Sequence, residues 1–394
     1  MQPHVSSATI CPLLNTADNF VGGNIFTHRS QWRCLTSDKW ILDVVVGNVL
    51  VFESLPVQSS LPRPLNLSRA HQNALDAALQ VFLKNKIIER CEAGDSPGFF
   101  SNVFPTFKID GLARVILNLK ELNNYVKYSH FKMDTIKDVI QLVHPSCYFM
   151  TVDFKDAYYS VPVRPKDREW LRFIWQNGTF QFTCLPQGLS SAPRIFTKLL
   201  KPVLSHLRKL LITVSCYIDD CIFIANSDKE LIDNVKYAVQ LFDSVGLTVN
   251  LNKSVLVPTQ KVEFLGITLN SSDMTATLPS RRRHSIKKQG NLLLKGDTSL
   301  HALAVFIGLT VASEPAVTLA PLRYKYLEIV RNKELCNWID VEENSGERGY
   351  CDINPASLAN SGLAPFSTEV VGRTSVPAPT RVPGFASHTH RQPS

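Results

Sequence analysis

Apolar residues in the first third of the chain follow two different periods. After Ser68, a plausible helix N-cap, apolar residues recur at the spacing of one helix face. These residues are Leu75, Ala78, Leu79, Phe82 and Leu83. In contrast, "WILDVVVGNVLVFE" alternates enough to predict a strand, or a hairpin that turns at Gly47-Asn48. The segment 101–123 predicts two strands joined at Asp110-Gly111, a typical hairpin signal.

From Cys147 onward the pattern predicts a sheet covered by helices. "CYFMTVDF" and "KVEFLGITL" each predict a strand, and residues 168–188 predict a hairpin that turns at Asn177-Gly178. "SSAPRIFTKLLKPVLSHLRKL" predicts a helix with Pro193 in its first turn, and "DKELIDNVKYAVQLFDSVG" predicts an amphipathic helix ended by Gly246. This order predicts an α+β fold, with helices on one face of an antiparallel sheet.

Two adjacent carboxylates interrupt the apolar run "SCYIDDCIFIA", which spans residues 215–225. Burying both Asp219 and Asp220 without a cation would be costly, so we expect them at a hairpin tip between "VSCYI" and "CIFIA". Asp153 ends another apolar strand, and pairing of the two elements would bring three carboxylates to one sheet end. An isolated pair of aspartates is usually a solvated turn. Three convergent carboxylates instead favour Mg²⁺, as two ions about 4 Å apart that serve phosphoryl transfer.

Composition bounds the class of protein without deciding its function. The chain has 394 residues and a formal net charge of +8, which permits a polyanionic partner and is equally compatible with simple solubility. Nine cysteines without paired spacing predict reduced thiols in an intracellular protein, cytoplasmic or nuclear. No signal peptide is recognisable, and the apolar stretch 41–52 is too short to span a bilayer, so we expect no membrane contact.

Five motifs then occur in one order: "VDFKDAYYSVPV", "LPQGLSSAPRIF", "YIDD", "GLTVNLNKS" and "EFLG". This order resembles the reverse transcriptases, motif by motif. The segments "WRCLTSDKWILDVVVG" and "GLTVASEPAVTLAPLRYKYLE" extend the resemblance to the polymerase of DIRS-like retrotransposons, which encode a tyrosine recombinase, over roughly Gly23 to Leu335. The resemblance implies a right-hand polymerase with fingers, palm and thumb. It also implies an RNA or DNA template with a primer, and dNTPs, as partners.

The resemblance assigns roles to individual residues of the palm. Asp153, Asp219 and Asp220 correspond to the catalytic metal-binding carboxylates, and the Phe154 carbonyl to a further metal ligand. Tyr158 corresponds to the ring beneath the incoming sugar, which would exclude a ribose 2′-OH; without the motif it would be read as a packing aromatic. The remaining residues assigned to the dNTP site in this region are the Asp156 and Ala157 backbone amides, Gln187 and Gly188.

The resemblance also assigns roles to residues beyond the carboxylates and the nucleotide site of the palm. Lys108 and Arg114 flank the Asp110-Gly111 turn and would hold the triphosphate, although spacing alone makes them solvated hairpin charges. Lys253 corresponds to a lysine proposed to protonate leaving pyrophosphate. The primer grip is assigned to Phe264, Leu265 and Gly266, and phosphate contacts from the thumb are assigned to Arg281, Arg282, Arg283, Lys287 and Lys288.

We expect five regions along the chain: a lead-in (1–60), fingers (61–146), a palm with an interleaved fingers segment (147–278), thumb or connection helices (279–336), and a disordered tail (337–394) rich in Ser and Pro. Spaced carboxylates of a ribonuclease H domain are not recognisable, and Ala320 stands where the family usually has Gly. Two hypotheses follow. The chain is an RNA-directed DNA polymerase, or it is a decayed or repurposed retroelement fragment that binds nucleic acid without useful turnover.

Overall fold

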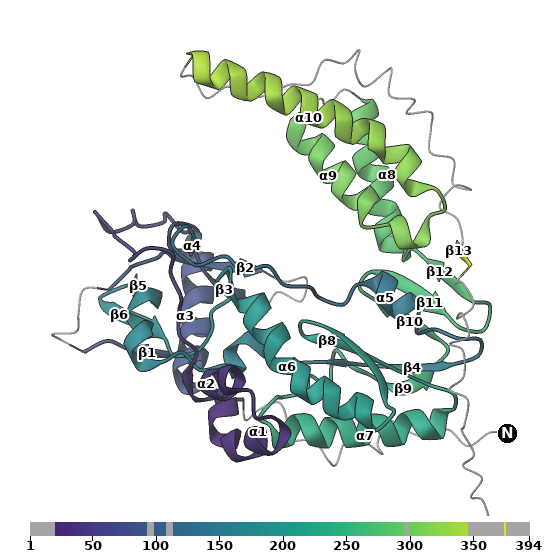
Figure 1. The fold of residues 1–394 in the computed structure, drawn as a ribbon. Helices are drawn as coiled ribbons and strands as arrows, with labels where there is room; N and C mark the ends of the chain where they lie inside the picture. Colours follow the sequence, from purple (N-terminus) through teal and green to yellow (C-terminus); the bar gives the residue numbers. More distant parts are fainter. Residues whose placement is uncertain (1–19, 93–97, 108–112, 296–298, 346–373, 376–394) are drawn as a thin grey trace, which may run out of the picture. The chain divides into compact units, whose positions relative to one another are not determined.

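The computed structural model describes residues 20–92, 98–107, 113–295, 299–345 and 374–375 (Figure 1). The chain divides into two compact units. The first contains Met1–Asp134 and Phe149–Thr259, and the second contains Thr135–Tyr148 and Gln260–Ser394. The sequence placed a boundary near residue 279, whereas the strands just before it group with the C-terminal helices. The limits of fingers, palm and thumb stay predictions.

A four-stranded sheet lies at the centre of the first unit, with strand order β7-β8-β4-β9. Its strands are β4 (Tyr148–Asp153), β7 (Thr213–Tyr217), β8 (Asp220–Ala225) and β9 (Val255–Thr259). The β7–β8 and β4–β9 pairs are antiparallel. The helices α6 (Ala192–Lys209) and α7 (Asp228–Ser244) cover one face, because the Phe154 ring contacts Phe196 of α6 and Phe242 of α7 edge-on, at centroid distances of 6.2 and 4.9 Å. The predicted arrangement of helices on one sheet face is confirmed.

One segment that the apolar pattern predicted as a strand or a hairpin is a helix, and a capping residue explains the difference. The predicted strand or hairpin around Gly47-Asn48 is wrong, because residues Lys39–Gly47 form the helix α2. The Asp38 side chain accepts hydrogen bonds from the amides of Trp40 and Ile41, which satisfies otherwise unpaired donors of the first turn. The buried residues Ile41, Val44 and Val45 recur at helical spacing. Before α2 come the short helices η4 (Asn24–His28) and α1 (Arg29–Leu35).

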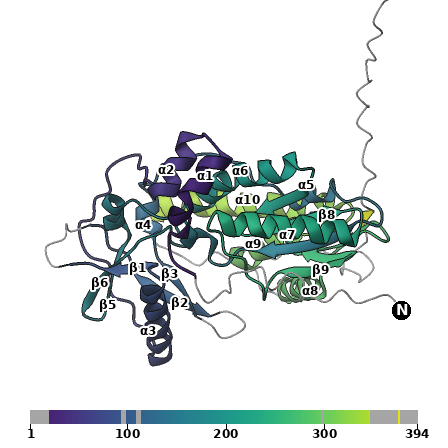
Figure 2. The same ribbon diagram turned by 90° about the horizontal axis from the view of Figure 1, so that it is seen from below.

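The expected helix after Ser68 is present as α3 (Arg69–Lys84), with the Ser68 hydroxyl accepting from the His71 amide. Helix α3 packs against the predicted hairpin of β2 (Val103–Phe107) and β3 (Ala113–Leu117) (Figure 2). The hairpin turn itself, with Asp110 and Gly111, lies outside the described residues. The short elements that follow are α4 (Lys120–Asn123), η5 (Ala157–Ser160) and η6 (Pro165–Leu171).

A second, three-stranded sheet of the first unit has the order β1-β6-β5. Its strands are β1 (Ile88–Arg90), β5 (Arg172–Trp175) and β6 (Gly178–Phe182). Trp175 pairs with Gly178, so the turn is centred on Gln176 and Asn177, one residue earlier than predicted. Gln176 adopts a φ of 50° there.

The second unit combines a hairpin sheet with a helical bundle. The predicted single strand "KVEFLGITL" is wrong, because it folds into two strands, β10 (Lys261–Phe264) and β11 (Ile267–Asn270), which pair antiparallel. Leu265 and Gly266, with φ of 47° and 74°, make the turn, a geometry that Gly adopts easily. The sheet continues with β12 (Thr275–Thr277) and β13 (Thr374–Ser375).

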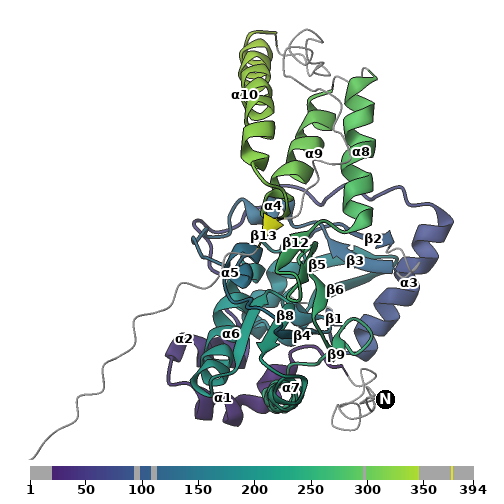
Figure 3. The ribbon, with the colours of Figure 1, turned by 90° about the vertical axis from the view of Figure 1, so that its right-hand side faces the viewer.

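Three helices of the second unit pack in chain order, α8 on α9 and α9 on α10 (Figure 3). They are α8 (Ser280–Leu294), α9 (Leu300–Val311) and α10 (Ala320–Ser345), and the unit also contains α5 (Ile136–Ile140) and η7 (Glu314–Ala316). Helix α10 runs past the expected start of the tail at residue 337. Most of residues 346–394 lie outside the described part of the chain. No helix in the described part is both long and apolar enough to span a membrane.

Candidate active site

The end of β4 and the tip of the β7–β8 hairpin meet through the backbone. Tyr217 pairs with Asp220, which leaves Ile218 and Asp219 as the turn residues. The Phe154 amide, directly after β4, donates to the Asp219 carbonyl at 2.8 Å. The Asp153 amide in turn donates to the Ser254 hydroxyl at 3.0 Å. The structure therefore brings Asp153, Asp219 and Asp220 to one place, as the sequence predicted.

The three carboxylates at this site are crowded, and burial and mutual repulsion disfavour the charged forms of Asp153 and Asp220. Burial, followed by the charges of Asp219 and Asp153, raises the pKa of Asp220 to about 6. Burial also raises the pKa of Asp153, which the nearby Lys253 opposes. The Lys253 ammonium lies 3.7 Å from one Asp153 carboxylate oxygen, whereas the other oxygen, Oδ1, is buried without a hydrogen-bond partner. An unpartnered buried carboxylate oxygen is costly unless something positive binds it.

The donor set suits a hard divalent cation. Carboxylate oxygens are the ligands that such ions prefer, and the buried Oδ1 of Asp153 has an unused lone pair. Among the residues that the structure describes, no group of three or more acidic, His or Cys side chains already has the arrangement of a metal centre. The three carboxylates are thus close together but not preorganised as a coordination shell.

A cavity of about 770 Å³ opens beside these carboxylates within the first unit. Eight of the residues that the resemblance assigned to the site line it: Arg114, Phe154, Asp156, Ala157, Tyr158, Gln187, Asp219 and Lys253. Asp153, Asp220 and Gly188 are not part of its lining. Lys108 lies outside the described residues, so its predicted role is not addressed. The cavity is large enough for a nucleotide-sized ligand.

Tyr158 forms part of the cavity wall and also packs against the core. It lies in η5, and its ring contacts Phe196 of α6 edge-on at a centroid distance of 5.9 Å. Burial, followed by the Asp219 charge, raises the Tyr158 pKa, so the phenol keeps its proton. One side of the ring therefore packs on Phe196 and the residue also borders the cavity, so its packing role is seen, whereas its contact with a sugar stays a prediction. Asp156, at the start of η5, adopts a φ of 51°.

The Gln187-Gly188 loop is fastened to α4 by one side chain. The Asn123 amide donates to the Gly188 carbonyl at 2.9 Å and accepts from the Ser190 amide at 2.9 Å. Gly188 has a φ of 101°, and a Cβ there would lie 3.0 Å from the Leu117 carbonyl oxygen. Both facts require glycine at this position, and the assignment of Gly188 to a dNTP site stays a prediction.

The residues assigned to the primer grip lie in the second unit, at the β10–β11 turn. The Arg282 guanidinium donates to the Gly266 carbonyl at 3.0 Å, and Arg281 forms an ion pair with Glu263. Two of the arginines expected to contact phosphates are therefore engaged in bracing this turn. Arg283, Lys287 and Lys288 remain exposed on α8.

Sequence reasoning assigned no site role to several residues that line the cavity. Lys155 and Asn250 line the cavity, and so do Ala74, Ala77, Ala78 and Val81 of α3. The alanines recur every three or four residues, a signal that marks one helix face. Ala78 had been placed on the apolar face of that helix, but neither it nor the other small residues had been expected to border a cavity.

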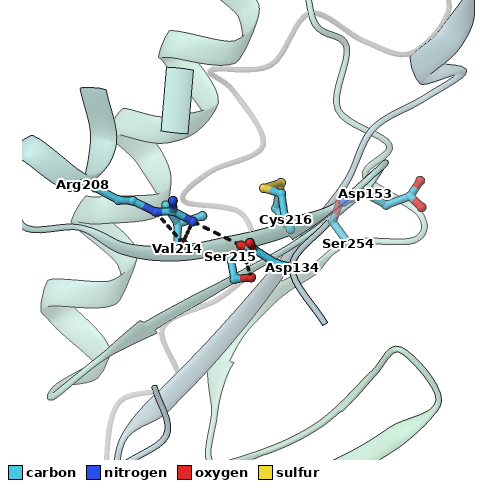
Figure 4. The surroundings of a disulfide bond; sticks show 8 residues. Asp134, Asp153, Arg208, Val214, Ser215, Cys216 and Ser254 are labelled. Atoms are coloured by element: carbon cyan, nitrogen blue, oxygen red, sulfur yellow. Dashed lines mark hydrogen bonds and ion pairs between the residues drawn. A yellow bond between two sulfur atoms is a disulfide. The ribbon is translucent and has the colours of Figure 1, made fainter. Parts of the chain in front are cut away.

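Two cysteines flank the carboxylate hairpin and form a disulfide, Cys216–Cys221, which corrects the expectation of reduced thiols (Figure 4). They face each other across the antiparallel strands β7 and β8. Beside them, the Ser215 hydroxyl donates to Asp134 at 2.9 Å, and Arg208 pairs with the same carboxylate at 3.3 Å. Cys34, Cys147 and Cys184 of the described chain are free thiols.

Comparison with known proteins relates part of this chain to a known family. Residues 103–269 match the family described as reverse transcriptase (RNA-dependent DNA polymerase). Similar curated proteins include the Tf2-3 and Tf2-4 transposon polyproteins of Schizosaccharomyces pombe (strain 972 / ATCC 24843), each 26% identical over 223 residues. The similarity covers 56% of this chain and 16% of each polyprotein, so the chain spans a small part of these relatives.

Solved structures of foamy viral protease-reverse transcriptase share the fold. The dRH form in complex with double-stranded DNA has a TM-score of 0.61 at 16% identity and covers 88% of this chain and 61% of that one. The complex with an RNA/DNA hybrid has a TM-score of 0.57 at 18% identity and covers 90% and 44%. Residues 103–269 are therefore similar to reverse transcriptase domains, and the chain shares the polymerase fold of these solved structures.

Proposed function

We propose that this chain extends the 3′-OH of a primer with dNTPs, copying an RNA or DNA template. The observation that carries the proposal is the meeting of Asp153, Asp219 and Asp220 beside a cavity of about 770 Å³. Structural neighbours whose titles name double-stranded DNA and an RNA/DNA hybrid support a primer–template duplex as the partner. The flanking sequence motifs support a retroelement of the DIRS-like group as the source of the domain.

The three carboxylates are the proposed ligands of two Mg²⁺ ions, with the Phe154 carbonyl as a further oxygen donor. When bound, the ions would lower the pKa of the primer hydroxyl and neutralise charge on the leaving pyrophosphate. Within the chain, the hydrogen bond from Phe154 to the Asp219 carbonyl holds Asp153 against the hairpin tip. The buried Oδ1 of Asp153 keeps its lone pairs for a cation.

The cavity residues have proposed roles in positioning the nucleotide. Arg114 reaches the triphosphate from β3, and the amides of Asp156 and Ala157 approach it from the start of η5. Tyr158 lies beneath the sugar and excludes a 2′-OH. Gln187 and Gly188 support the base side of the site, because Asn123 fixes their loop. Lys253, now 3.7 Å from Asp153, would turn to the leaving pyrophosphate and supply a proton.

A nucleic-acid-binding protein without turnover is the second candidate. Two observations favour it: the carboxylates of the described chain are not arranged as a finished metal centre, and Lys253 already neutralises part of the Asp153 charge. Metal binding by this domain therefore has to be measured together with its activity.

Primer extension on poly(rA)/oligo(dT) with Mg²⁺ tests the proposal. We expect labelled product with the wild-type chain, and none with EDTA or with Asp219→Asn. A gel-shift measurement on the same duplex provides the control, since the variant should still bind it. Binding without extension by the wild-type chain, with either Mg²⁺ or Mn²⁺, would replace the polymerase by the second candidate.

A further inference from the structure

The Cys216–Cys221 disulfide encloses the two hairpin carboxylates. Only four residues separate the cysteines, and Asp219 and Asp220 are two of them. The cysteines are direct cross-strand partners, with Cα atoms 4.1 Å apart. The bond therefore ties together the two strands directly beneath the residues proposed to hold metal. Whatever opens this bond changes the freedom of those carboxylates.

The two sulfur-bearing residues differ in access. Cys216 is 6% exposed and lines a hollow of about 520 Å³ between α6 and β7, whereas Cys221 is fully buried. Thiol–disulfide exchange begins with attack of a thiolate on one sulfur, and exposure decides which sulfur is reached. Cys216 is therefore the sulfur that an outside thiol can attack, and Cys221 is the leaving group.

The same hollow is positively charged. Lys132, Lys201, Arg208 and Lys209 line it, together with Asp134 as its acidic residue. Asp134 already pairs with Arg208 and accepts from Ser215. Among the described residues, the three lysines have no ion-pair or hydrogen-bond partner, and all three are exposed. Unpaired cations around an access route attract anionic reagents over neutral ones.

We propose that Cys216–Cys221 is a thiol–disulfide exchange site for an anionic low-molecular-weight thiol of the glutathione class, which enters through the lysine-lined hollow. Its thiolate attacks the Cys216 sulfur, the S–S bond breaks, and the Cys221 thiolate leaves and takes a proton from water. A second thiolate attacks the outer sulfur of the mixed disulfide and releases the Cys216 thiolate with the oxidised reagent. Two thiols thus supply the two electrons.

Reduction then loosens the carboxylate hairpin. Without metal, the like charges of Asp153, Asp219 and Asp220 repel each other, and the cross-link opposes separation of the strands that carry two of them. The disulfide limits how far β7 and β8 can separate, and the hydrogen bonds between the two strands already provide part of this restraint. Reduced protein should therefore bind a divalent cation roughly three- to tenfold more weakly. This consequence, unlike the exchange itself, rests on the proposed function of the carboxylates.

Exchange kinetics test the site directly. Both cysteines fall on one tryptic peptide, residues 210–229, so alkylation after timed exposure to a thiol can be followed by mass spectrometry. The reagents are reduced glutathione and the neutral thiol 2-mercaptoethanol, compared at equal thiolate concentration. The test variant is Lys132→Gln/Lys201→Gln/Lys209→Gln. The control, Lys120→Gln/Lys166→Gln/Lys236→Gln, removes the same charge from residues that do not line the hollow.

We expect the test variant to react with glutathione roughly fivefold more slowly at low salt, and the deficit to shrink as salt screens the charges. Reaction with 2-mercaptoethanol should change less than about twofold, and the control should match wild type. Equal slowing with both thiols, or a peptide that is fully alkylated before any reduction, would refute the exchange site.

Calorimetric binding of Mn²⁺ tests the consequence. The comparison uses oxidised wild type, reduced wild type and Cys216→Ser/Cys221→Ser, with Cys34→Ser as the control because Cys34 is an exposed free thiol. Weaker binding by the reduced protein supports the proposal, and the reduced wild type provides the test if the double variant fails to fold. Equal affinity in both redox forms refutes the coupling. If no form binds Mn²⁺, the proposed function fails. The exchange kinetics would still show whether Cys216–Cys221 is a thiol–disulfide exchange site.

Discussion

At the scale of single residues, the site is defined by carboxylates whose charges are only partly compensated. Asp220 has a pKa raised to about 6, and Asp153 keeps one buried oxygen without a partner. Both features cost stability in the metal-free protein and are the features that a bound cation would relieve. The residue-scale predictions follow from this conflict between stability and binding.

The first prediction concerns stability. Asp220 has a pKa of about 6 in the folded chain and about 4 in the unfolded chain, so the folded chain binds this proton more tightly. Proton binding therefore stabilises the fold fully below about pH 4, and this stabilisation is lost as the pH rises through about 6. Asp220→Asn removes the cost of holding an ionised carboxylate at this partly buried, crowded position. With EDTA and near pH 7.5, the variant should gain about 1 kcal/mol in unfolding free energy, and the gain should vanish near pH 4. Denaturant unfolding at both pH values measures it; an unchanged or lower stability near pH 7.5 would contradict the charge crowding.

The second prediction concerns turnover. Asp219→Asn should fold normally, because Asp219 is a turn residue whose backbone makes the contact with Phe154. Loss of one proposed metal ligand should reduce primer extension by a factor of roughly a thousand or more. Steady-state extension and duplex binding should be measured together. Activity close to that of wild type would remove the carboxylates from the mechanism.

The third prediction concerns the choice of sugar. Tyr158 is held from behind by Phe196, so its ring cannot retreat from a ribose 2′-OH. Tyr158→Val should lower the ratio of dGTP to rGTP incorporation efficiency by roughly tenfold or more while leaving primer binding unchanged. A ratio that does not fall would make Tyr158 a packing residue, with sugar selection elsewhere.

At the scale of elements, capping and turn geometry decided what apolar periodicity left ambiguous. "WILDVVVG" became a helix because Asp38 caps it, and "KVEFLGITL" became a hairpin because Leu265 and Gly266 adopt positive φ. Short apolar runs with β-branched residues fit either a buried helix or a strand. The decisive information lay in one polar residue before the first run and one glycine within the second.

The fourth prediction tests that cap. Asp38→Ala removes the acceptor of the Trp40 and Ile41 amides and should destabilise the protein by about 1 kcal/mol. The matched control is Asp43→Ala, an exposed carboxylate on the same helix with no hydrogen-bond partner among the described residues. Chemical denaturation of both variants measures the difference. Equal effects would show that charge near α2, rather than capping, stabilises it.

At the scale of the whole molecule, two compact units divide the assigned residues. The carboxylates and the cavity belong to the first unit, and the assigned primer grip and helices α8 to α10 belong to the second. The proposed polymerase therefore needs both units, whereas the proposed metal and nucleotide contacts need only the first.

The fifth prediction concerns the C-terminal region. A chain ending at Ser345 retains all of α10 and loses only the two paired residues of β13 within the described structure. The composition after residue 345 offers few large apolar residues, so the truncated chain should keep its unfolding free energy within about 1 kcal/mol and its primer extension within about twofold. Limited proteolysis of the full chain should reach the same endpoint. A truncated chain that unfolds or loses activity would show that the tail is structural.

Local information was sufficient for much of this protein. The helix after Ser68, the hairpin around Asp219 and the helix ended by Gly246 follow from caps, glycines and periodicity, all of which act within a few residues. The order of motifs was enough to name the kind of domain. These features need no knowledge of distant contacts, because each is encoded by neighbours along the chain.

Tertiary structure alone decided how those pieces meet. The sequence could not show that Arg281 and Arg282 brace the turn at Gly266, that alanines of α3 border the cavity, or that Cys216 and Cys221 are bonded. Each depends on contacts between elements, and a surface charge, a small residue or a thiol looks the same in sequence whether or not it has a partner. The partner is determined by packing, which is a property of the folded chain.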